Sequence, residues 1–136
     1  MRIAIAAIGR MKQGPERELV ARYLDRAKAA GRPLALTGFE VLEFAESRAA
    51  TTETRKTDEA ATLRSALPEG IRIALDEHGR TMPSAQFATQ LARWRDDGRP
   101  AVSFVIGGAD GLDPAFVREV DLTLSFYRRN YIEGLF

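Results

Sequence analysis

Glycines between an apolar run and the start of a helix form the first candidate site for chemistry. Gly107, Gly108 and Gly111 lie between the run Ala101–Ile106 and Pro114. Because glycine has no Cβ, such a backbone can approach a ligand closely and turn its amides toward it. The loop lacks both the Gly-Lys-Ser/Thr ending of a Walker loop and the Gly-x-Gly-x-x-Gly dinucleotide pattern. The spacing alone leaves two interpretations equally open, a cofactor loop and a tight strand-to-helix turn.

A second candidate follows the apolar run Ile71–Leu75, where the sequence continues as Asp76–His78 and Gly79. A carboxylate at the end of a parallel strand can meet a ligand hydroxyl or amine, and Leu75 is placed to contact an apolar or aromatic group. The alternative is a charged turn closed by Gly79. For His78 a solvated loop position is favoured, because the chain has no second histidine and no cysteine.

Two more groups have both a functional and a purely structural interpretation. The segment Leu122–Phe126 could line a pocket beside the glycine loop, or it could be a plain edge strand. Arg10 and Lys12 follow the first apolar run, and with Arg80 they could contact phosphate. A solvated rim explains these three cations at least as well, because most basic side chains in proteins are exposed.

Composition limits the classes of protein that fit. A chain of 136 residues, 45% hydrophobic and 29% charged, is typical of one globular domain. The absence of cysteine excludes disulfides and thiolate sites and agrees with a cytoplasmic protein, and a single histidine excludes a His-rich metal site. The first apolar run stops at Gly9, too early for a signal peptide or membrane span. The net charge is +1, but arginine outnumbers lysine, which keeps RNA open as a partner beside a simple genomic bias.

Short apolar runs alternate with amphipathic stretches along the whole chain. The runs predict strands at residues 2–8, 33–44, 71–75, 101–106 and 122–126. The amphipathic stretches predict helices at residues 15–29, 58–67 and 84–96, the last capped by Ser84, and a short helix that Pro114 opens. The polar run Glu46–Thr57 is predicted to be a loop.

This alternation predicts one α/β domain over residues 1–136, with a mostly parallel sheet of about five strands and helices on both faces. Such sheets bind ligands beyond the carboxyl ends of their strands. Both glycine-containing candidates lie at such strand ends. The elements therefore bring the two candidates to the same edge of the sheet.

In this order, the segments resemble those of a known family, the small bacterial SPOUT methyltransferases that modify N3 of pseudouridine in large-subunit (23S) ribosomal RNA. The likeness runs from Met1 to Phe126. It is carried by Ile-Gly-Arg-Met-Lys after the first strand, Glu18–Leu24, Leu75–Gly79, Gly107–Leu112 with the strand before it, and Leu122–Phe126. The combined pattern is far more specific than any one loop.

The resemblance implies an α/β knot fold, S-adenosylmethionine as cofactor, a homodimer, and ribosomal RNA in the large subunit or assembled ribosome as partner. The composition adds the expectation of no metal and no membrane. Carried over by position, the cofactor would contact Leu75, Gly107 and Phe126, with Gly108 supporting the turn. Arg10, Lys12 and Arg80 remain the candidates for RNA contact. The resemblance assigns no catalytic base.

The sequence departs from the family after Phe126. The family continues through a Pro-His pair, a long amphipathic helix and a terminal Tyr-His-Arg, whereas residues 127–136 form an atypical, shorter tail. Two further functions therefore stay open beside methyl transfer. One is a non-catalytic RNA- or ribosome-binding remnant of the family, which would bind RNA in a salt-dependent way. The other, less favoured, is a small enzyme that binds another nucleotide through the glycine loop.

Overall fold

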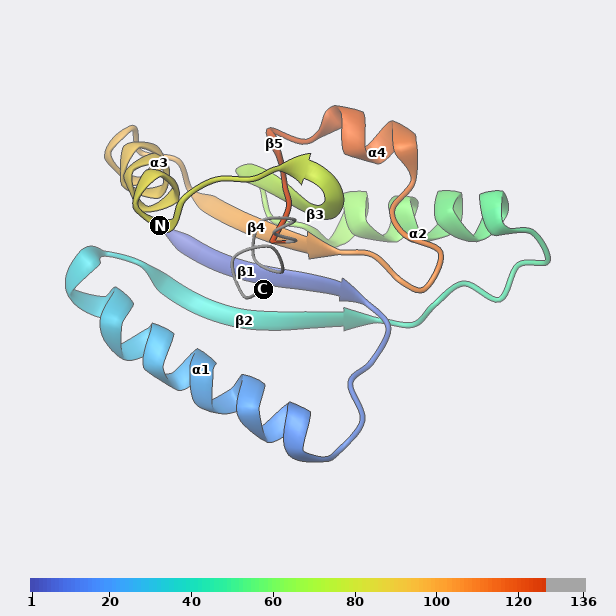
Figure 1. Ribbon diagram of the computed structural model, residues 1–136, viewed down its shortest axis with the longest axis horizontal. Helices are drawn as coiled ribbons and strands as arrows, with labels where there is room; N and C mark the ends of the chain where they lie inside the picture. Colours follow the sequence, from blue (N-terminus) through green and yellow to red (C-terminus); the bar gives the residue numbers. More distant parts are fainter. Residues whose placement is uncertain (127–136) are drawn as a thin grey trace, which may run out of the picture.

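A five-stranded parallel sheet in the order β2-β1-β4-β3-β5 organises the protein, in a computed structural model that describes residues 1–126 (Figure 1). The expected parallel α/β architecture is confirmed. The strands are β1 (Arg2–Ile8), β2 (Thr37–Phe44), β3 (Ile71–Arg80), β4 (Ala101–Ile106) and β5 (Leu122–Leu124). The helices are α1 (Pro15–Gly31), α2 (Thr52–Ala66), α3 (Ser84–Asp96) and α4 (Pro114–Glu119), with a short 3-10 turn at Arg32–Leu34.

Successive side chains of a strand point to opposite faces of the sheet, so the core consists of two clusters, one on each face. On one face, side chains of β1 and β4 pack with Leu63 of α2 and Phe116 of α4. On the other face, Ile3, Ile73 and Val102 pack with residues that include Phe87, Leu91 and Trp94 of α3. The central strands are therefore apolar on both faces, as the continuous run Arg2–Ile8 predicts. Helix α1 lies beside the edge strand β2 and buries only Gly31 (Figure 1).

Helix α2 begins earlier than the sequence pattern predicts. It starts at Thr52, so the second half of the expected loop Glu46–Thr57 is helical. The Thr51 hydroxyl oxygen accepts a hydrogen bond from the Thr54 amide at 3.1 Å, which satisfies one of the free amides of the first turn. The first turn of α2 is polar and faces solvent, so it lacks the apolar spacing from which a helix is predicted.

The expected Ser84 cap is also wrong, because Ser84 is the first residue inside α3 and no side chain caps that helix.

Strand β3 is longer and β5 shorter than expected. β3 continues past Leu75 to Arg80, and its last part curls at the end of the strand (Figure 1). The Ser125 amide donates to the Arg80 carbonyl at 2.8 Å, and Gly79 lies so close to the backbone of Leu124 that a Cβ there would stand 2.8 Å from it. This backbone contact pairs Arg80 with Leu124, the residue that Leu75 also pairs with, so the register of β3 shifts between Leu75 and Arg80. Strand β2 begins at Thr37, because Arg32–Leu34 form the 3-10 turn.

The Ser103 hydroxyl is a polar group in the core of the described part of the chain. Ser103 on β4 is fully buried, and its oxygen has no hydrogen-bond partner among residues 1–126. Because an unpaired buried hydroxyl costs free energy, Ser103→Ala is expected to raise the free energy of unfolding by about 1 kcal/mol in urea denaturation. Ser47→Ala is the control, since Ser47 donates to Asp58 at 2.9 Å and is expected to lose stability. A destabilised Ser103→Ala would contradict this account.

One expectation concerns the end of the chain. The atypical tail at residues 127–136, which stands where the family has its last cofactor loop and the helix that threads the knot, lies outside the described residues. Within residues 1–126, no helix is long and apolar enough to cross a membrane.

Candidate cofactor site

A cleft of about 540 Å³ opens at the carboxyl ends of β3 and β4. The two strands are neighbours in the sheet, and Leu75 pairs in register with Ile106. Their ends therefore bring the Asp76–His78 segment and the glycine loop together, as the sequence predicts. The cleft is lined by Lys56, Leu75, Asp76, Glu77, His78 and the continuous segment Ile106–Leu112.

The glycine loop is a tight turn whose shape depends on missing side chains. The Gly111 amide donates to the Gly108 carbonyl at 3.0 Å and closes the turn, and Gly111 has a φ of +84°. A Cβ on Gly107 would lie 2.9 Å from the Gly111 carbonyl carbon, closer than real Cβ contacts allow. A Cβ on Gly108 would lie 3.0 Å from the side chain of Ile8. The loop is therefore both a tight turn and a wall of the cleft, so the two interpretations of its spacing are compatible.

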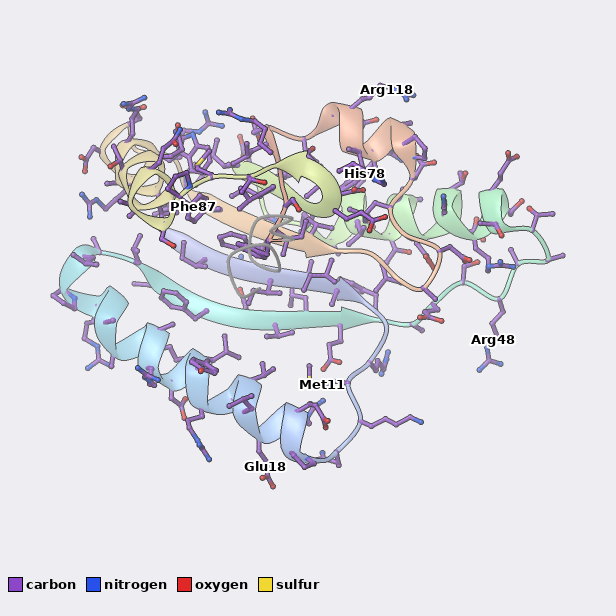
Figure 2. All side chains as sticks on the ribbon, in the orientation of Figure 1. Met11, Glu18, Arg48, His78, Phe87 and Arg118 are labelled. Atoms are coloured by element: carbon purple, nitrogen blue, oxygen red, sulfur yellow. The ribbon has the colours of Figure 1, made fainter. Side chains whose placement is uncertain are left out.

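The cleft combines an apolar part with a charged rim. Leu75 and Leu112 are half-buried and Ile106 is 42% exposed, which leaves apolar surface available to a flat ligand group. Asp76 accepts a hydrogen bond from the His78 amide at 2.8 Å, and its Oδ1 lies 3.2 Å from His78 Nδ1. The His78 side chain is 85% exposed at the curled end of β3 (Figure 2).

Asp110 ties the glycine loop to helix α2. Arg55 Nε donates to Asp110 Oδ2 at 2.7 Å, and Nη2 donates to Oδ1 at 3.3 Å. These hydrogen bonds hold the pKa of Asp110 below its usual value and raise that of Arg55. The pair therefore remains charged at neutral pH and down into the acid range, where protonation of Asp110 would break it.

The structure places Phe126 beside a second cleft. That cleft has a volume of about 260 Å³ and lies between α3 and the end of β5, lined by Thr81, Met82, Ser84, Phe87, Ala88, Leu91, Leu124, Ser125 and Phe126. Phe126 is 72% exposed and does not line the first cleft. Leu75, Gly107 and Gly108 thus share one cleft, while the cofactor role of Phe126 stays a prediction.

The three candidate RNA-contacting cations are exposed at carboxyl ends of different strands. Arg10 and Lys12 follow β1, and Arg80 ends β3, with β4 between those two strands. Glu43 of β2 holds the first loop, because its carboxylate accepts a hydrogen bond from the Met11 amide at 2.5 Å. This bond, with nearby Arg17, lowers the pKa of Glu43. The cations therefore lie on one edge of the sheet but in separate places.

The family is decided by a comparison with protein-family models. The model described as "Predicted SPOUT methyltransferase" matches residues 1–130, nearly the whole chain. The chain belongs to the SPOUT methyltransferase family. The resemblance carried by the Leu75–Gly79 and Gly107–Leu112 segments is confirmed.

Relatives within this family are close to half identical to the chain over the aligned residues. The protein called ribosomal RNA large subunit methyltransferase H from Rhodopseudomonas palustris (strain HaA2) is 48% identical over 127 residues, which cover 93% of this chain and 79% of the relative. Proteins of the same name from Bradyrhizobium sp. (strain BTAi1 / ATCC BAA-1182) and Nitrobacter hamburgensis are each 47% identical, with the same coverage of both chains.

Sequence reasoning missed the contribution of α2 to this candidate site. Lys56 lines the cleft, Arg55 pairs with Asp110, and the Glu59 carboxylate lies beside Gly108. The signal that could have found them is Thr51, a residue type that often caps helices, followed by the acidic Glu53 in the first turn. Arg48, which projects from the loop before α2, is an exposed cation that was also not singled out (Figure 2).

Proposed function

We propose that this chain is an S-adenosylmethionine-dependent methyltransferase that acts on N3 of a pseudouridine in large-subunit ribosomal RNA. The observation that carries the proposal is the glycine turn beside Leu75 and Ile106, at the carboxyl ends of adjacent parallel strands, in a chain of a methyltransferase family. The name of the relatives supports ribosomal RNA as the substrate class.

The residues of the cleft fit the proposed cofactor. An adenosyl group needs apolar contact for its ring and hydrogen bonds for its edge, and Leu75, Ile106 and Leu112 provide apolar surface beside the backbone of the glycine turn. The Cβ clash at Gly107 shows how closely this backbone is packed. Asp76 can accept hydrogen bonds from ribose hydroxyls or an amine, and Lys56 can pair with a carboxylate. When bound, S-adenosylmethionine supplies an electrophilic methyl group.

The protein's part in the reaction is to orient the two substrates. Methyl transfer to a ring nitrogen requires in-line approach and the loss of the N3 proton. Arg10, Lys12 and Arg80 are the proposed contacts for RNA phosphates, which would position the base at the open side of the cleft. We propose that the chain works in the cytoplasm as a homodimer. The apolar side chain of Phe126, which is 72% exposed and lies outside the first cleft, favours coverage by a second copy.

The test is methyl transfer from radiolabelled S-adenosylmethionine to large ribosomal subunits and to whole ribosomes that lack the modification. We expect label in the large-subunit RNA, with mass spectrometry locating it as N3-methylpseudouridine. Salt-dependent RNA binding without transfer would instead favour the non-catalytic remnant. Transfer of the methyl group to a different base would contradict the proposed position.

A further inference from the structure

Helix α2 is attached at two points to the segment that follows β4, each time through a two-point arginine–carboxylate pair. Near its start, Arg55 pairs with Asp110 of the glycine loop at 2.7 and 3.3 Å. Near its end, Arg64 pairs with Glu119 of α4 at 2.9 and 3.0 Å. Nine residues of helix place the two arginines about 14 Å apart along α2. The pairs are alike in chemistry, but only the first reaches the cleft.

Arg55 connects three segments of the site. Besides Asp110, its guanidinium donates through Nη1 to the Ala49 carbonyl at 3.1 Å, in the loop that precedes α2. The Arg55 and Asp110 side chains are 28% and 26% exposed, so the pair is partly shielded from water. Among residues 1–126, Arg55 is the only residue that donates side-chain hydrogen bonds to the segment 107–112. The loop before α2 and the glycine loop are thus held by one side chain.

Glu59, one helical turn after Arg55, also lies between the glycine loop and the loop before α2. It is 6% exposed, accepts a hydrogen bond from the Ser47 amide at 3.1 Å, and has its Oε1 3.4 Å from the position of a Cβ on Gly108. Residues four apart share one face of a helix, so Arg55 and Glu59 both face the glycine loop. This face of α2 forms the outer support of the loop.

We propose that Arg55 is a positioning residue that holds the glycine loop, through Asp110, in the shape that binds the cofactor. A glycine-rich segment has many accessible backbone conformations, so ordering it during binding costs conformational entropy. If one conformation is fixed before binding, the binding step no longer carries this entropy cost. The ligand named here rests on the proposed function. The positioning of the loop does not, because the ion pair is formed by two residues of the chain itself.

The experiment compares Arg55→Gln with the matched control Arg64→Gln in the 136-residue chain. The first readout is the hydrogen-exchange rate of the Gly111 amide, which closes the turn, measured by NMR in the absence of ligand. The second is calorimetric titration with S-adenosylmethionine. We expect Arg55→Gln to weaken the affinity about tenfold, since a loop that is correctly shaped a tenth of the time binds a tenth as well. Gly111 exchange is expected to become faster by about tenfold or more, because the turn is then open most of the time. Arg64→Gln is expected to change neither quantity.

Rescue separates positioning from general stabilisation. Arg55→Lys keeps the charge and can make one contact to Asp110, so we expect it to recover part of the Gly111 protection. Unchanged Gly111 exchange in Arg55→Gln, or an equal change in Arg64→Gln, would overturn the proposal. Absence of S-adenosylmethionine binding in the unsubstituted chain would overturn the proposed function instead. The exchange measurements would still decide whether Arg55 holds the loop.

Discussion

Gly107→Val is expected to reduce the affinity for S-adenosylmethionine at least about a hundredfold, since even a small misplacement of binding groups is costly. The Cβ alone would lie 2.9 Å from the Gly111 carbonyl carbon and 3.0 Å from the Leu112 amide nitrogen. Both are backbone atoms of the loop itself, so the turn must shift. The substitution would therefore act by distorting the binding loop. Calorimetric titration measures the loss.

The control for this substitution is Gly98→Asn, in the turn that precedes β4 at the opposite end of the strand. Gly98 has a φ of +76°, and a Cβ there meets nothing within 4 Å. Asparagine tolerates this left-handed conformation better than most residues, so folding and affinity are expected to persist. If Gly107→Val bound S-adenosylmethionine as tightly as Gly98→Asn, the glycine loop would not be the cofactor site.

Phe116→Ala is expected to have the largest effect on stability, a loss of about 3–5 kcal/mol in the free energy of unfolding. Phe116 of α4 is fully buried and packs in the cluster that includes Leu63 and Val105. Its ring also lies 5.8 Å from the guanidinium carbon of Arg64. Removing the ring would leave a cavity between α4, α2 and the sheet. Urea denaturation monitored by circular dichroism measures the change.

Leu19→Ala provides the comparison for Phe116→Ala. Leu19 lies on α1 and is 48% exposed, so its truncation removes little buried surface, and alanine is at least as good a helix former. We expect a change within about 0.5 kcal/mol, as is usual for surface positions. A similar loss in both variants would show that α4 does not complete the core as described.

The sequence predicts the central part of the fold well because burial there leaves a strong pattern. β1 and β4 keep the predicted bounds, since both faces of these strands are covered and both runs are almost entirely apolar. The start of α2 and the end of β3 were missed for the opposite reason. Thr51 caps a polar first turn, and Arg80 is held by a backbone bond to Ser125. Neither the Thr51 cap nor the bond between Arg80 and Ser125 produces a periodic pattern of apolar residues in the sequence.

The sequence likewise predicts some features of the candidate site and misses others. Leu75 and Gly107 could be placed together because they follow neighbouring parallel strands. The pairing of Arg55 with Asp110 could not be predicted, because the two residues are 55 positions apart and their contact depends on where α2 begins. Long-range contacts between polar side chains leave no periodic signal in one sequence. The support of the loop therefore became visible only in the structure.

The most direct test of the account is an NMR titration of the 136-residue chain with S-adenosylmethionine, followed through its backbone amides. We expect saturable shifts at residues 75–78 and 107–112, which line the cleft between β3 and β4. S-adenosylhomocysteine is expected to compete for the same amides. Absence of saturable shifts, or shifts confined to the second cleft at residues 81–91, would contradict the assignment of the glycine loop as the cofactor site.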